Sequence, residues 1–168
     1  MKHIAILIES LYEDLEVNYP FYRLREEGFS VSLAGTQKGV EYKGKYGYPR
    51  VSDCATKDLS EADFDAVVIP GGFAPDLMRR HSATLEFVSR MDKAGRVVAA
   101  ICHGGWILAS ACDMRGRKAT SFFAIKDDLI HAGADYVDME VVRDRNLITS
   151  RKPDDLPAFV KEIISALK

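Results

Sequence analysis

The chain contains few cysteines: Cys54, Cys102 and Cys112 are the only three in 168 residues. They form no Cys-x-x-Cys pair, and no cysteine–histidine cluster has the spacing of zinc ligands. This pattern indicates neither a disulfide framework nor a structural metal. We therefore expect neither a metal nor a cofactor. The open question is whether one of the thiols is reactive.

The chain also lacks an excess of either charge and any long apolar run. It contains 23 Lys and Arg residues and 25 Asp and Glu residues, which gives a net charge of −2. No basic field therefore attracts nucleic acid or anionic lipid. The apolar run at residues 4–8 stops at Glu9 without a cleavage site, and no stretch approaches the roughly 18 apolar residues of a membrane helix. We expect a cytoplasmic protein with no nucleic-acid or membrane partner.

What the sequence does contain is a regular alternation of apolar runs and helical spacing. Apolar runs typical of strands cover residues 4–8, 29–34, 65–69, 96–101 and 146–150. Helical spacing covers about 14–27, 82–94 and 153–167, with a further stretch ending near 111. Strands this apolar are expected where helices cover both faces of a parallel sheet. The pattern predicts one α/β sandwich domain over residues 1–168, with a hairpin or irregular loop at 36–53.

Cys102 stands where one apolar strand runs directly into a helix, and His103 and two glycines follow it. This arrangement is typical of a nucleophile elbow, in which a sharp turn lifts the reactive side chain above the sheet. A helix N-terminus lowers the pKa of a thiol, and the backbone N–H groups of the turn can face an oxyanion. His103 suits a base or a proton donor. Most free cysteines are merely small buried residues; we favour the nucleophile for Cys102 and the structural role for Cys54 and Cys112.

Two further segments lie at the carboxyl ends of predicted strands, where ligands bind in open parallel sheets. Glu13 follows the first strand, and it either places a carboxylate beside the thiol or occupies a first helical turn, where acids are favourable. We interpret Asp14 and Glu16 as such helix-start acids. The turn at 70–72, Pro-Gly-Gly, offers N–H groups to an anion or has no function. No glycine-rich phosphate loop follows the first strand, which argues against a nucleotide site.

Together these segments resemble the motifs of the PfpI-type family of intracellular proteases and deglycases. The motifs are Tyr12-Glu13-Asp14-Leu15-Glu16, Pro70-Gly71-Gly72 with Ala74-Pro75-Asp76, Ala100-Ile101-Cys102-His103-Gly104, Thr120-Ser121, Ile125-Lys126-Asp127-Asp128, Ala132-Gly133-Ala134, and Thr149-Ser150-Arg151 with Pro153. The similarity covers essentially the whole chain. The family belongs to the superfamily of the parkinsonism-associated deglycase and the class I glutamine amidotransferases. The resemblance implies a flavodoxin-like fold, a mostly parallel sheet with helices on both faces.

The resemblance also implies roles for individual residues. Cys102 would be the nucleophile, with Glu13 hydrogen-bonded to its thiol. His103 would be the partner of Cys102, reached by Asp76 from a neighbouring subunit of a homo-oligomer, a dimer or a hexamer. The backbone N–H groups of Gly72 and His103 would form the oxyanion hole. Substrates would be small carbonyl compounds, their protein adducts, or peptides.

The chain departs from the family pattern around the predicted pocket. Asp76 stands where relatives often carry glutamate, and Gly105, followed by Trp106, stands in place of the familiar proline. Phe122 stands where some relatives have tyrosine, and Lys152 replaces a histidine or a small residue. We predict a thiol hydrolase or lyase that acts on small carbonyl adducts, as a glyoxalase or deglycase does, with peptide hydrolysis as an alternative. A different class of protein, a redox sensor or chaperone-like stress protein with an oxidisable cysteine, is the second alternative.

Overall fold

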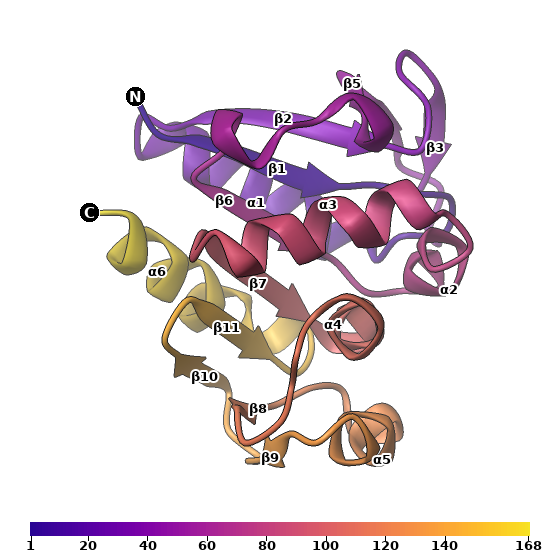
Figure 1. Ribbon diagram of the computed structural model, residues 1–168. Coiled ribbons are helices and arrows are strands. Elements are labelled where there is room, and N and C mark those ends of the chain that lie inside the picture. Colours follow the sequence, from indigo (N-terminus) through magenta and orange to yellow (C-terminus); the bar gives the residue numbers. More distant parts are fainter.

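Seven strands form the central sheet of the computed structural model, which describes residues 1–168 (Figure 1). Their order is β10-β11-β7-β6-β1-β2-β5. Their bounds are β1 His3–Leu7, β2 Ser30–Gly35, β5 Cys54–Ala55, β6 Ala66–Ile69, β7 Val97–Ile101, β10 Val141–Asp144 and β11 Leu147–Ser150. Every neighbouring pair is parallel except β10 and β11. The predicted α/β class with a mostly parallel sheet is confirmed.

Helices cover both faces of this sheet, as Figure 1 shows. Helices α1 (Asp14–Glu26) and α6 (Leu156–Leu167) pack against each other on one face, and α3 (Ser82–Lys93) and α4 (Gly105–Ala111) pack on the other. Two short helices, α2 (Ala74–Met78) and α5 (Lys126–His131), contact α4. Strands β1, β6, β7 and β11 are almost wholly buried between these layers, which explains their largely apolar sequences.

Two small ribbons lie outside the central sheet. Strands β3 (Glu41–Lys43) and β4 (Pro49–Val51) form an antiparallel hairpin, so residues 36–53 contain the predicted hairpin. Strands β8 (Lys118–Ala119) and β9 (Asp135–Tyr136) form a parallel pair that the sequence did not predict. None of the helices combines the length and the hydrophobicity of a membrane-spanning segment.

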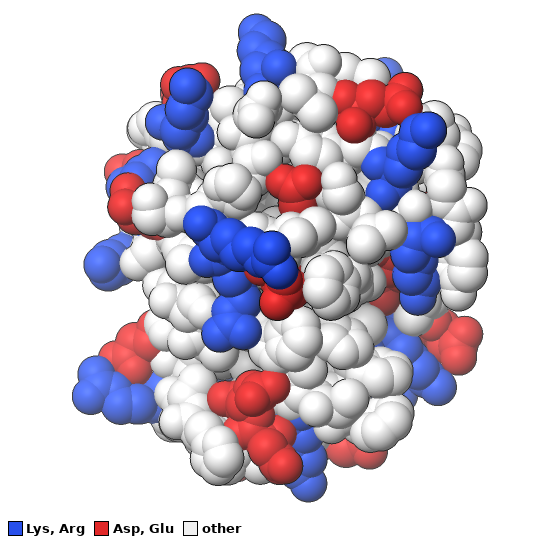
Figure 2. All heavy atoms as spheres, turned by 90° about the vertical axis from the view of Figure 1, so that its right-hand side faces the viewer, with Lys and Arg blue, Asp and Glu red and all other residues white.

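The order of the strands reverses beside β1. From β1 the chain proceeds outward to β2 and β5, and it then returns to β6 and β7 on the other side of β1. The segments that leave β1 and β6 therefore diverge to opposite faces, which opens a crevice at the carboxyl ends of these strands. Figure 2 shows the molecule from this side: charges of both signs are scattered among uncharged side chains, without a large patch of one sign.

Candidate active site

Cys102 lies at the end of β7, as the first residue of a single 3₁₀ turn (Cys102–Gly104) that leads into α4. Its φ angle is 60°, in the left-handed region that a residue with a Cβ rarely adopts. This sharp turn is the elbow expected from the sequence. Gly104 permits it, because a Cβ at that position would lie 2.5 Å from the carbonyl oxygen of Ile69 in β6.

A cavity of about 520 Å³ opens above the thiol. Residues from six segments line it: Glu13, Leu15, Glu16, Lys45, Tyr46, Gly72, Phe73, Cys102, His103, Trp106, Phe122 and Pro153. Two of the residues that depart from the family pattern, Trp106 and Phe122, are thus walls of the cavity. Lys152 lies in a neighbouring hollow with Phe123. The volume falls in the range of small-molecule sites.

The carboxyl group beside the thiol belongs to Glu16. A Cβ at Gly71 would lie 2.7 Å from Glu16 Oε2 and 3.0 Å from Cys102 Sγ, so the two atoms flank the same point. The backbone N–H of Gly71 donates to Glu16 Oε2 at 2.6 Å, whereas Oε1 is buried without a hydrogen-bond partner. Glu16 is completely buried. One carboxyl oxygen is therefore left free to interact with the sulfur or with a substrate.

Glu13 lines the same cavity but faces a different partner. Its Oε1 accepts the backbone N–H of Leu15 at 3.3 Å, and its Oε2 pairs with Lys45 Nζ at 2.6 Å. The predicted hydrogen bond between Glu13 and the thiol was therefore wrong, and so was the interpretation of Glu16 as a mere helix-start acid. The reason is that Glu13 is the N-cap of α1, whereas Glu16 lies one turn further, on the face buried against the sheet.

A signal for Glu16 was present in the sequence. Glu16, Pro20 and Leu24 follow one another at intervals of four residues, and all three are buried. An acid in an otherwise apolar stripe of a helix is a candidate functional residue, because a buried acid is costly unless the site uses it. Lys45 gave no such signal, since it comes from a loop tip far along the chain.

Burial controls the ionisation of the site. It raises the pKa of Glu16 to about 8, so this carboxyl group carries its proton at neutral pH. The pKa of Cys102 is raised to about 12, mainly by burial and secondly by the negative charge that Glu16 carries when ionised. The expected lowering by a helix N-terminus does not dominate, since α4 is short and the sulfur is buried. Backbone N–H groups of His103 and Gly72 and the charge of Lys45 act in the opposite direction and favour the thiolate.

His103 is the nearest base. Its Nδ1 lies 3.3 Å from Cys102 Sγ, and its ring stacks on Phe122 at 5.0 Å between centroids. Burial and the charge of Lys45 lower the pKa of His103, so the imidazole is neutral and can accept a proton. The backbone N–H groups of His103 and Gly72 lower the pKa of the Cys102 thiol, and their role as an oxyanion hole stays a prediction.

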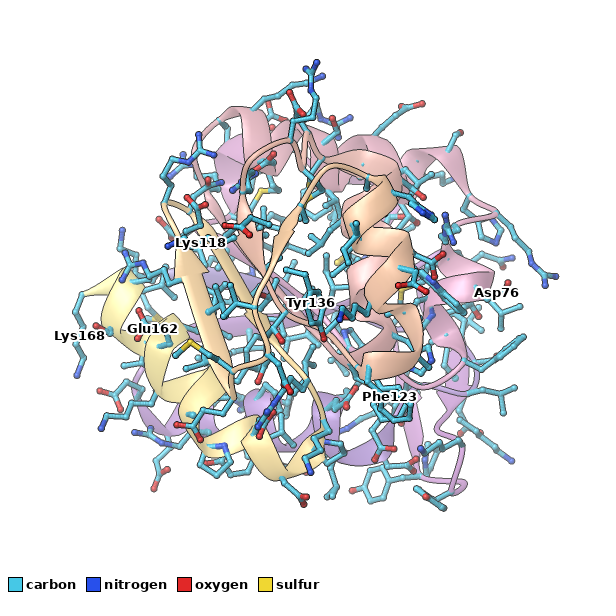
Figure 3. All side chains as sticks on the ribbon, turned by 90° about the horizontal axis from the view of Figure 1, so that it is seen from below. Asp76, Lys118, Phe123, Tyr136, Glu162 and Lys168 are labelled. Atoms are coloured by element: carbon cyan, nitrogen blue, oxygen red, sulfur yellow. The ribbon has the colours of Figure 1, made fainter.

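Asp76 does not contact His103 within the chain. It lies on α2, and its carboxylate accepts a hydrogen bond from Arg80 at 2.6 Å. In Figure 3 Asp76 lies at the edge of the molecule to which the strands point, whereas Lys118, Glu162 and Lys168 lie on the opposite side. Its contribution across a subunit boundary stays a prediction.

The other two cysteines lie outside the cavity. Burial raises the pKa of both thiols, that of Cys112 to about 12, with further contributions from Asp53 beside Cys54 and Asp92 beside Cys112. Neither is followed by a base such as His103. No group of three or more His, Cys, Asp or Glu side chains is arranged to hold a metal ion.

Comparisons with known proteins identify the family of this chain. Residues 2–166 match the family model described as DJ-1/PfpI family. A deglycase of Pyrococcus abyssi is 45% identical over 98% of this chain and 99% of its own length. A Bacillus subtilis protein, YraA, whose name gives a cysteine protease as a provisional assignment, is 41% identical over 99% of both chains.

A solved structure from Anabaena variabilis superposes with a TM-score of 0.97 and 46% identity, over 99% of this chain. That protein has two domains, one DJ-1/ThiJ/PfpI-like and one ferritin-like, and this chain spans 50% of its length.

Proposed function

The chain belongs to the DJ-1/PfpI family, and on that premise we propose that it is an enzyme, a cysteine-dependent hydrolase or lyase acting on small carbonyl compounds or on their adducts with proteins. The observation that carries this proposal is the position of Cys102, on a strained turn inside a small cavity, with His103 Nδ1 at 3.3 Å from its sulfur and the buried carboxyl group of Glu16 beside it. The name of the Pyrococcus abyssi relative, a deglycase, supports the substrate class.

The groups around Cys102 suit addition of the thiol to an aldehyde. His103 Nδ1 takes the thiol proton, and the sulfur forms a bond to the carbonyl carbon while the carbonyl π electrons move to oxygen. The N–H groups of Gly72 and His103 stabilise the oxyanion. Glu16 then gives its proton to that oxygen, which yields a neutral hemithioacetal and leaves the proton from sulfur on His103.

The cavity favours small substrates. Its volume of about 520 Å³ and its aromatic walls, Tyr46, Phe73, Trp106 and Phe122, suit a short carbonyl compound or the tip of a modified side chain. With a 2-oxoaldehyde, a proton then moves from the carbon that bears the sulfur to the neighbouring carbonyl carbon, through an enediol, which oxidises the first carbon, reduces the second and yields a thioester. Water is the second reactant: it hydrolyses the thioester and releases the hydroxy acid and the free thiol. Peptide hydrolysis, which the name of the Bacillus relative suggests, is a second candidate.

The proposal is tested by turnover of methylglyoxal, a methylglyoxal-modified amine and a panel of peptide–coumarin substrates. We expect the wild-type protein to consume the first two and Cys102→Ser to consume neither. Cys112→Ser is the matched control, since it makes the same change outside the cavity, and it should retain activity. Consumption of methylglyoxal by folded Cys102→Ser would refute the proposal. If the wild-type protein cleaved only the peptide substrates, its function would instead be that of a protease.

A further inference from the structure

A lysine from a distant hairpin reaches the cavity. The loop between β3 and β4 is fastened to the start of α1: the backbone N–H groups of Tyr46 and Tyr48 donate to the buried carboxylate of Asp14 at 2.9 and 3.0 Å. The N–H of Lys45 donates to the carbonyl oxygen of Tyr12 at 2.9 Å. These bonds hold the backbone of residue 45 against the segment that follows β1, where the cavity lies.

The side chain of Lys45 continues into the cavity. Its Nζ pairs with Glu13 Oε2 at 2.6 Å, and it lies 5.0 Å from the ring centroid of Tyr46. The side chain of Glu13 is only 5% exposed, whereas that of Lys45 is 41% exposed. The ammonium group therefore enters from solvent and meets a buried acid at the mouth of the site.

Lys45 is the only cation of the cavity wall. The ionisable side chains that line the cavity are Glu13, Glu16, Lys45, Tyr46, Cys102 and His103. Thiolate formation and addition to a carbonyl both create negative charge close to the two acids. Without a positive group, that charge would have to form in a buried site whose other ionisable groups are negative or neutral.

We propose that Lys45 provides the electrostatic control of this site. Its ammonium group, held by Glu13, supplies the positive charge that stabilises both the Cys102 thiolate and the oxyanion formed from a substrate. The charge of Lys45 lowers the pKa of Cys102, of Glu16 and of His103 alike, which agrees with a position facing all three. The inference deepens the proposed function, because it assigns the electrostatic control of the same thiol.

A purely structural role for the ion pair is the competing explanation. Fastening the hairpin does not require Lys45, since Asp14 already binds two N–H groups of the loop and Leu11 donates its N–H to Lys43 at 2.8 Å. A partly exposed ion pair also adds little to the stability of the fold. The two explanations predict different results for the pH profile of the thiol.

The experiment measures the rate of iodoacetamide alkylation at Cys102, mapped by mass spectrometry from pH 6 to pH 10, in wild type, Lys45→Met and Lys45→Arg. Loss of the charge should slow alkylation of Cys102 at pH 7.5 by roughly three- to tenfold, as expected of one partly screened charge, and should move the profile to higher pH. Lys45→Arg keeps the charge and should retain most of the reactivity. The His103 ring should titrate at higher pH in Lys45→Met, as followed by NMR.

Lys43→Met is the matched control. Lys43 lies two residues earlier on the same hairpin, is 68% exposed, and approaches only Glu41, at 3.9 Å. Its profile should coincide with that of the wild type. Coincident profiles of Lys45→Met and wild type, with an unchanged melting temperature, would overturn the proposal. Alkylation requires no turnover, so this result is distinct from failure of the proposed function, which retained activity of Cys102→Ser would show.

Discussion

The substitution Glu16→Gln should make the protein more stable than the wild type at neutral pH. Glu16 is completely buried, and burial raises its pKa from the ordinary 4.5 to about 8. Below pH 4.5 the carboxyl is protonated in both the folded and the unfolded chain, so its titration has no effect on stability. Above that pH the unfolded chain releases the proton and the folded chain keeps it, so the free energy of unfolding falls as pH rises toward 8.

The size of the effect follows from the separation of the two pKa values. Each pH unit between them lowers the free energy of unfolding by about 1.4 kcal/mol. At pH 7 the free energy of unfolding of the wild type should thus be lower than at pH 4.5 by at most roughly 3 kcal/mol. Glu16→Gln has the shape of the protonated acid and does not titrate. Its advantage over the wild type should therefore grow with pH.

Urea unfolding of both proteins at pH 5, 6, 7 and 8 measures this difference. Glu86→Gln makes the same change at an exposed position of α3 and serves as the control. The difference between its free energy of unfolding and that of the wild type should be the same at all four pH values. A constant difference between Glu16→Gln and the wild type would mean that Glu16 is ionised in the folded protein. It would refute the assignment of a protonated acid beside Cys102.

Three further predictions follow from the geometry. Cys102 should react with iodoacetamide faster than Cys54 or Cys112, because only Cys102 has a base, His103, against its sulfur; peptide mapping after partial alkylation tests this order. Gly104→Ala should lower the free energy of unfolding, measured in urea, by about 1–3 kcal/mol, because the added Cβ would lie 2.5 Å from the carbonyl oxygen of Ile69. An unchanged urea midpoint would contradict this close approach. If Asp76 acts across a subunit boundary, activity should vanish on dilution to a demonstrated monomer, and full monomer activity would exclude this role.

The sequence predicted the parts of the fold that long, strongly patterned segments form. The runs at β1, β6 and β7 are apolar throughout because helices cover both faces, and that pattern is visible without a structure. Strands β8 and β9, of two residues each, were not predicted. Such short segments show no period, and only the tertiary fold pairs them.

The site was predicted where a local motif determines the geometry and missed where the chain brings distant segments together. The turn at Cys102 could be inferred from a strand followed by His103 and glycines. The choice between Glu13 and Glu16 depends on the rotation of α1, which places Glu13 at the N-cap and Glu16 against the sheet. Lys45 enters the site because Asp14 and the segment that follows β1 bind the hairpin loop, and Asp14 lies 32 and 34 positions before the two residues that it binds.

The central claim, that Cys102 carries the reaction, is tested most directly by partial alkylation. Samples of wild-type protein are treated with iodoacetamide for increasing times, and each is assayed for methylglyoxal consumption and for the modified fraction of Cys102. Residual activity should fall in proportion to unmodified Cys102 and reach zero when this residue is fully alkylated. Substantial activity in a sample whose Cys102 is completely alkylated would contradict the claim.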